Sequence, residues 1–138
     1  PWKGLGFMAN YTRLDSKGQY DPADGIVTGN AVVGFTPTTF NAGLSYAYGA
    51  WDVRVKANSR SNPLVTYNAN PAARYYRFPR TIFDVNVKYA WRPWLCFYVD
   101  VINLFAASLQ DSYVYIRDRV RITNVYTPEV KAGISGRF

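Results

Sequence analysis

The last segment of the chain, residues 127–138, alternates between apolar and polar side chains with a period of two. Val130, Ala132, Ile134 and Phe138 share one parity, whereas the charged residues of the segment take the other. Successive side chains of a β-strand point to opposite faces, so this period is typical of a strand with one apolar and one polar face. We therefore predict an amphipathic strand at this end of the chain.

The same alternation recurs in five further segments. It is strict in residues 81–92 and nearly strict in residues 51–60, and it is weaker in residues 5–12, 40–48 and 94–105. Each segment has about ten residues, the length that a tilted strand needs to cross a bilayer. The pattern predicts an all-β fold, an antiparallel up-and-down sheet of about six long strands that forms a segment of a transmembrane outer-membrane β-barrel.

The connections between these strands alternate in length. Tight turns are expected at Gly49 and Ala50 and around Pro93, and long loops at residues 15–36, 63–80 and 106–126. Short turns at one end and long loops at the other are typical of outer-membrane barrels. Four aromatic residues gather at the short-turn end, where an aromatic girdle would meet a membrane interface: Tyr48, Trp51, Trp91 and Trp94.

Charged side chains within the predicted strands all take the polar parity. They are Asp52, Asp84, Asp100, Glu129, Arg54, Lys56, Arg60, Lys88, Arg92, Lys131 and Arg137. A basic side chain that faces lipid near the midplane costs about 2–4 kcal/mol, so a lipid-facing wall requires this segregation. A soluble antiparallel sheet with one solvated face segregates charge in the same way. The alternation permits Asp52 or Asp84 to pair with Arg or Lys on neighbouring strands.

Composition adds few constraints. The 138 residues are 49% apolar and 17% aromatic, which excludes a disordered chain, and the net charge of +7 permits anionic partners. The chain has no histidine, so the commonest general base and metal ligand is missing, and we expect neither enzymatic activity nor a cofactor. Cys96 has no partner for a disulfide, and we interpret it as a small buried residue.

Four motifs in order resemble the C-terminal part of TonB-dependent outer-membrane receptors. They are GFMANYTRLDS, FTPTTFNAGLSYAYGAWDVRVKANSRS, DVNVKYAWRPWLCFYVDVINLF with its Asn103-Leu104-Phe105 element, and DRVRITNVYTPEVKAGISGRF. Ala106-Ala107 and Thr127-Pro128 depart from the family's usual residues at those places. The resemblance covers nearly the whole chain, so residues 1–138 would form the last quarter of a barrel of about 22 strands, without the plug domain and the earlier strands.

The resemblance implies a place in the bacterial outer membrane and active uptake of a scarce ligand of the siderophore, cobalamin or oligosaccharide class. The implied partners are membrane lipid, lipopolysaccharide, the transported ligand, and the TonB complex through the missing N-terminal part. The barrel assembly machinery would read Val130, Ala132, Ile134 and Phe138 as its signal. Phe138 could equally serve only as a girdle residue.

Arginine and tyrosine side chains alternate in the two later loops. The candidate ligand-contacting residues are Arg74, Tyr75, Tyr76, Arg77, Arg80, Arg117, Arg119 and Arg121. Guanidinium groups give paired donors to carboxylates or phosphates, and aromatic faces stack on flat or cationic ligands. A solvated rim that touches lipopolysaccharide phosphates would have the same composition. Nucleic acid is not an expected partner, because no signature of a nucleic-acid-binding domain is present.

Two other functions fit the same pattern. One is a complete small outer-membrane barrel that acts as an adhesin or anchor, and the other is a soluble β module that binds an anionic polymer. Contact between the first and last strands would indicate a closed small barrel, and two free edges a wall segment. The weak alternation in residues 112–125 also permits a hairpin that protrudes beyond the wall.

Overall fold

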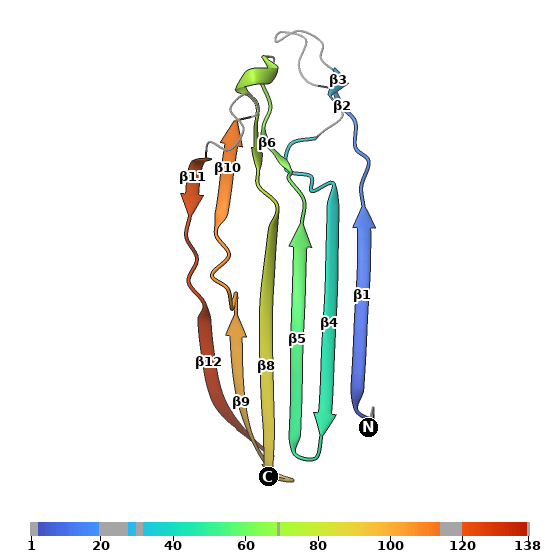
Figure 1. Ribbon diagram of the computed structural model, residues 1–138, viewed down its shortest axis with the longest axis vertical. Helices are drawn as coiled ribbons and strands as arrows, with labels where there is room; N and C mark the ends of the chain where they lie inside the picture. The colour runs from blue at the N-terminus through green and yellow to red at the C-terminus, as the bar shows by residue number, and fades with distance from the viewer. Residues whose placement is uncertain (1–2, 20–27, 30–31, 69, 114–119, 138) are drawn as a thin grey trace.

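The computed structural model describes residues 3–19, 28–29, 32–68, 70–113 and 120–137, and its main feature is an antiparallel sheet of six long strands (Figure 1). The strands are β1 (Leu5–Arg13), β4 (Thr38–Tyr48), β5 (Trp51–Arg60), β8 (Arg80–Arg92), β9 (Leu95–Ile102) and β12 (Glu129–Gly136). They lie side by side in the order β1-β4-β5-β8-β9-β12, which is their order along the chain. This confirms the predicted all-β, up-and-down fold.

Both predicted tight turns lie at one end of this sheet, and the longer connections lie at the other (Figure 1). Strand β9 is shorter than the predicted segment 94–105, because the backbone of Asn103 adopts a φ of 57° and leaves the extended conformation. Within the described residues, no helix is long and apolar enough to cross a bilayer.

Strand register places most of the large apolar side chains of the long strands on one side, with Met8, Ile82 and Ile102 as exceptions on the other. One row across the sheet is formed by Phe7, Leu44, Val55, Val85, Val101 and Val130, each opposite the next. The next polar row is formed by Gly6, Ser45, Arg54, Asn86, Asp100 and Lys131. Because neighbouring rows alternate in character, the sheet has one continuous apolar face and one continuous polar face.

The apolar face does not form a core. Phe7 is 81% exposed and Ile134 is 65% exposed, although both lie on strands with regular backbone pairing. Among the described residues, the only hydrophobic side chain that is buried is Leu64, which is 2% exposed and lies outside the long strands. A contiguous exposed apolar surface of this kind is typical of an interaction surface rather than of a solvated one.

A second antiparallel sheet lies beyond the long-connection end of the first (Figure 1). It contains β6 (Leu64–Thr66), β7 (Tyr75–Arg77), β10 (Leu109–Tyr113) and β11 (Val120–Asn124) in the order β11-β10-β7-β6, and the 3₁₀ helix η2 (Pro71–Ala73) lies between β6 and β7. The segments predicted as loops at 63–80 and 106–126 are therefore partly strands. We call this four-stranded sheet the rim sheet.

Strand β10 pairs antiparallel with β11 beyond the long sheet, where the sequence permitted a hairpin. Leu109 lies opposite Asn124, and Asp111 lies opposite Ile122, before the register shifts at a bulge. In the first long connection, β2 (Gly18–Gln19) pairs with β3 (Thr28–Gly29). Each of the three long connections therefore carries strand structure of its own.

The turn at Asn103 joins the long sheet to the rim sheet. The side chain of Asn103 is only 6% exposed; its Nδ2 donates to the carbonyl of Tyr126 at 3.2 Å, and its Oδ1 accepts from the amide of Ala107 at 2.9 Å. Its backbone N–H donates to Asp84 Oδ1 at 2.9 Å. Asparagine tolerates the left-handed conformation better than most residues, which explains its use at this turn.

Replacing Asn103 with alanine should lower the free energy of unfolding by about 2–3 kcal/mol. The variant loses the buried side-chain hydrogen bonds and puts at a positive φ a residue that tolerates this conformation less well than asparagine does. The measurement is urea unfolding of the chain folded in detergent micelles. The control is Asn41→Ala, which removes one exposed hydrogen bond to Asn10 and should cost about 1 kcal/mol or less. Equal losses in the two variants would contradict this role for Asn103.

Candidate functional site

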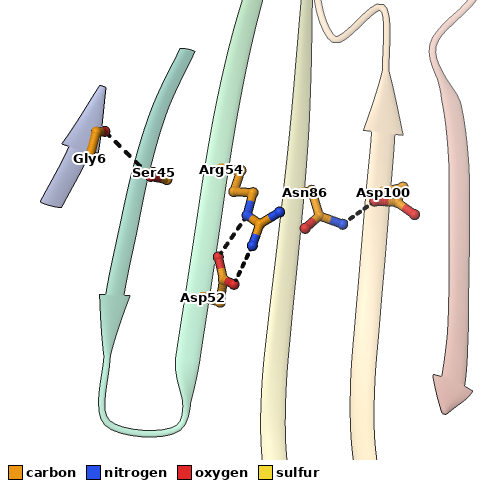
Figure 2. A network of polar contacts seen from close by, with 6 residues as sticks. All are labelled: Gly6, Ser45, Asp52, Arg54, Asn86 and Asp100. Carbon is orange, nitrogen blue, oxygen red and sulfur yellow. Dashed lines mark hydrogen bonds and ion pairs between the residues drawn. The ribbon is translucent and has the colours of Figure 1, made fainter. Parts of the chain in front are cut away.

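The polar face of the long sheet carries a hydrogen-bonded row of side chains (Figure 2). Arg54 makes two hydrogen bonds to Asp52, at 3.1 and 2.9 Å, and the Asn86 amide donates to the Asp100 carboxylate on the next strand. Farther along the row, the Ser45 hydroxyl donates to the carbonyl of Gly6 at 3.4 Å. The row is therefore a polar surface built by several strands.

The ion pairs on this face lie within single strands, not across neighbouring strands as the sequence permitted. Asp52 lies opposite Lys88 in register, but its carboxylate pairs with Arg54 on its own strand. Lys131 likewise pairs with Glu129 of its own strand at 3.1 Å. Side chains two positions apart on a strand share a face, so they can reach each other without a partner strand. The Asp84 carboxylate accepts from the turn at Asn103 instead.

In the rim sheet, Arg77 is held by a partly buried ion pair. Its Nε and Nη2 atoms donate to the two carboxylate oxygens of Asp111 at 2.8 and 3.3 Å. Asp111 is 6% exposed and lies directly opposite Arg77 in the β7–β10 pairing. The hydrogen bond to Asp111 raises the pKa of Arg77 above its usual value. Arg77 therefore holds two strands of the rim sheet together.

Three other candidate arginines lie over aromatic rings. Arg74 lies 4.6 Å from the ring centre of Tyr67, Arg121 lies 4.8 Å from that of Tyr75, and Arg80 lies 4.9 Å from that of Tyr126; these are cation–π distances. These contacts fix the guanidinium planes and leave their edges as hydrogen-bond donors.

Tyr75 has a perturbed phenol group. A hydrogen bond with the Thr66 side chain lowers the pKa of Tyr75, and Arg121 lowers it further through a hydrogen bond and its positive charge. Partial desolvation opposes these effects. The tyrosine thus links β6, β7 and β11 within the rim sheet.

The remaining candidate residues are divided between the two sheets. Tyr76 lies on β7, whereas Arg117 and Arg119 fall outside the described residues. The proposed assembly-signal residues Val130, Ala132 and Ile134 lie on β12, exposed on the apolar face, and Phe138 falls outside the described residues.

The aromatic residues predicted as a girdle lie where the sequence placed them. Tyr48 lies opposite Trp51 across the tight turn, and the Trp51 ring lies 4.6 Å from that of Tyr89 on the next strand. Trp91 lies 6.1 Å from Phe97, and Trp94 belongs to the second tight turn. Trp51, Trp91 and Trp94 are at least half exposed. This end of the sheet therefore presents an exposed aromatic band.

A cavity of about 220 Å³ lies where the long sheet meets the rim sheet. Its apolar lining includes Leu64, Phe78 and Leu109, and its charged lining consists of Arg60, Arg77 and Arg80. Sequence reasoning assigned Arg60 to the wall of the barrel and missed this cavity, because the residues that line it come from four separate segments. The adjacency of Arg60 and Arg80 depends on the β5–β8 register, which the sequence does not display.

Other chemistry is sparse in the described part of the chain. No cluster of three or more His, Cys, Asp or Glu side chains there could hold a metal ion. Cys96 is a free thiol that is half-buried, not buried as expected, because it lies on the open polar face of β9.

No family model, no curated protein and no solved structure matches this chain.

Replacing Asp111 with asparagine should destabilise the rim sheet by about 2 kcal/mol. The change leaves the Arg77 guanidinium without its counter-charge in a partly buried position. Amide hydrogen exchange in β7 and β10 measures this local stability. The matched control is Asp15→Asn, whose carboxylate pairs with Arg13 at 3.5 Å with both side chains well exposed, and it should change little. Unchanged exchange in the Asp111 variant would show that the pair is not structural.

Proposed function

We propose that the chain forms the C-terminal wall of the barrel of a TonB-dependent outer-membrane receptor that takes up a scarce ligand. The observation that carries this proposal is the in-register apolar face of the six long strands, which has no core behind it. Motif order and an aromatic band at the short-turn end support it. The ligand would be a siderophore, a cobalamin or an oligosaccharide.

The energetic argument concerns what covers the apolar face. Moving one large apolar side chain out of water stabilises a protein by about 1.5–3 kcal/mol, and this face carries such residues on every strand. In a soluble β module these side chains would stay in water, and the stabilisation would be absent. Lipid chains cover an apolar sheet face without needing a complementary shape, and the charged rows on the other face then line an aqueous interior.

The edges of the long sheet favour a wall segment over a small closed barrel. Within the described residues, β1 pairs only with β4 and β12 pairs only with β9, so the first and last strands do not meet. Hydrocarbon requires every backbone polar group to be paired, so both edges need neighbouring strands. In the proposed receptor, other strands of the barrel supply them.

Adjacent residues of β1 provide a test of the membrane-facing surface. Phe7→Arg places a charge on the apolar face and should reduce the free energy of folding into lipid vesicles by about 2–4 kcal/mol. Met8→Arg, at nearly the same depth, places the charge on the polar face and should cost less than 1 kcal/mol. The measurement is urea-dependent folding of the complete barrel that contains this chain into phosphatidylcholine vesicles. Equal costs for the two variants would mean that lipid does not cover the apolar face.

Uptake by whole cells tests the transport function. Cells that lack the protein should lose accumulation of one radiolabelled probe among a ferric siderophore, cobalamin and a maltooligosaccharide, and complemented cells should regain it. Collapse of the proton-motive force with an uncoupler should abolish the regained uptake, because transport of this type draws on that gradient. Unchanged accumulation of all three probes, or uptake that persists after uncoupling, would contradict the proposed transport.

A further inference from the structure

We propose that the cavity between the long sheet and the rim sheet binds an oxyanion, a carboxylate or phosphate group of a soluble ligand, between Arg60 and Arg80. The inference rests on the proposed function and narrows it to an anionic ligand. It starts from the register, in which Arg60 at the end of β5 lies directly opposite Arg80 at the start of β8.

Directly opposed arginines are an unusual arrangement. Residues opposite each other on neighbouring strands have Cβ atoms about 5 Å apart, and like charges in that position destabilise a sheet. Arg77, the third arginine of the cavity, is neutralised by Asp111. For Arg60 and Arg80, no ion pair occurs within the described residues, and none of the described residues that line the cavity is acidic.

Arg80 carries a second sign of a missing partner. Its Nε atom is buried and has no hydrogen-bond acceptor among the described residues, while the Tyr126 ring supports one face of the guanidinium at 4.9 Å. An unpaired buried donor lowers stability, and more so when the group is charged. An oxyanion placed between the two arginines would accept from both guanidinium groups and remove the repulsion between them.

The walls of the cavity are held in place by backbone hydrogen bonds. The Gly34 amide donates to the carbonyl of Leu64 at 2.9 Å, the Arg77 amide to the carbonyl of Pro63 at 3.1 Å, and the Phe78 amide to the carbonyl of Gln110 at 2.8 Å. These bonds tie together the segments that form the lining. A preformed cavity loses little conformational entropy when a ligand binds.

Position on the sheet identifies the source of the anion. Arg60 and Arg80 share the parity of the polar face, with Thr12 and Thr39 in the same row. Lipid would cover the opposite face, so a lipid headgroup approaches these arginines from the wrong side. We therefore assign the cavity to a soluble anion that reaches the polar side of the sheet.

The test uses the whole chain folded in detergent micelles, with citrate and inorganic phosphate as probes. Titration calorimetry gives the affinity, and the NMR signals of arginine Nε–H groups locate the site. Arg60→Gln and Arg80→Gln should each weaken binding about tenfold, because each removes charged hydrogen bonds to the anion. The matched control is Arg92→Gln, which removes the same charge from the other end of β8 and should change affinity less than about twofold.

Three outcomes would overturn the assignment. One is an absence of saturable binding in a wild-type chain that circular dichroism shows to be folded, and another is an equal loss in the Arg92 variant, which would indicate unspecific attraction. The third is binding of lipopolysaccharide that depends on Arg60 and Arg80 while citrate and phosphate do not bind, since the source would then be a lipid headgroup. Normal folding of the complete barrel into vesicles without anion binding would refute this site alone, whereas anion binding without folding of the complete barrel into vesicles would refute only the membrane wall.

Discussion

The backbone hydrogen-bond ladder of the long sheet sets the phase of all six strands. A slip of one residue at any pairing would move the apolar side chains of one strand to the charged face, because side chains alternate with a period of two. The ladder therefore produces both surfaces at once, and it also brings Arg60 opposite Arg80 at the far end of the sheet. The apolar face, the polar face and the cavity all depend on the same register.

The rim sheet is held together by a different kind of force. Its strands have three to five residues each, which is too few for the backbone hydrogen bonds alone to make the sheet stable. Side-chain contacts supply the remaining stability. Asp111 joins β7 to β10 through Arg77, and Tyr75 joins β7 to β11 through Arg121. Arg77 and Arg121, which suggested ligand capture from the sequence, are thus part of the framework, whereas Arg60 and Arg80 line the cavity proposed for the anion.

Features of the fold that depend on a repeated local pattern could be predicted from the sequence. The period of two identified every long strand, and loop lengths identified which end carries the tight turns. It could not find the Arg77 and Asp111 pair, because those residues lie 34 positions apart and meet only after β7 and β10 have paired. Strands of three residues, such as β6 and β7, show too few alternations to be distinguished from loops. The polar row was predicted as a face, but its individual partners were not.

An apolar sheet face without a core makes stability depend on the medium. Most globular domains bury their apolar side chains in a core of their own, so one free energy of unfolding describes such a domain in any dilute buffer. For this chain, the exposed Phe7 or Ile134 side chain contributes little to folding in water, whereas in hydrocarbon it would stabilise the folded state. An apolar-to-polar substitution on this face would therefore change stability little in water and lower it strongly in hydrocarbon, and folding would be a property of the chain together with its surroundings.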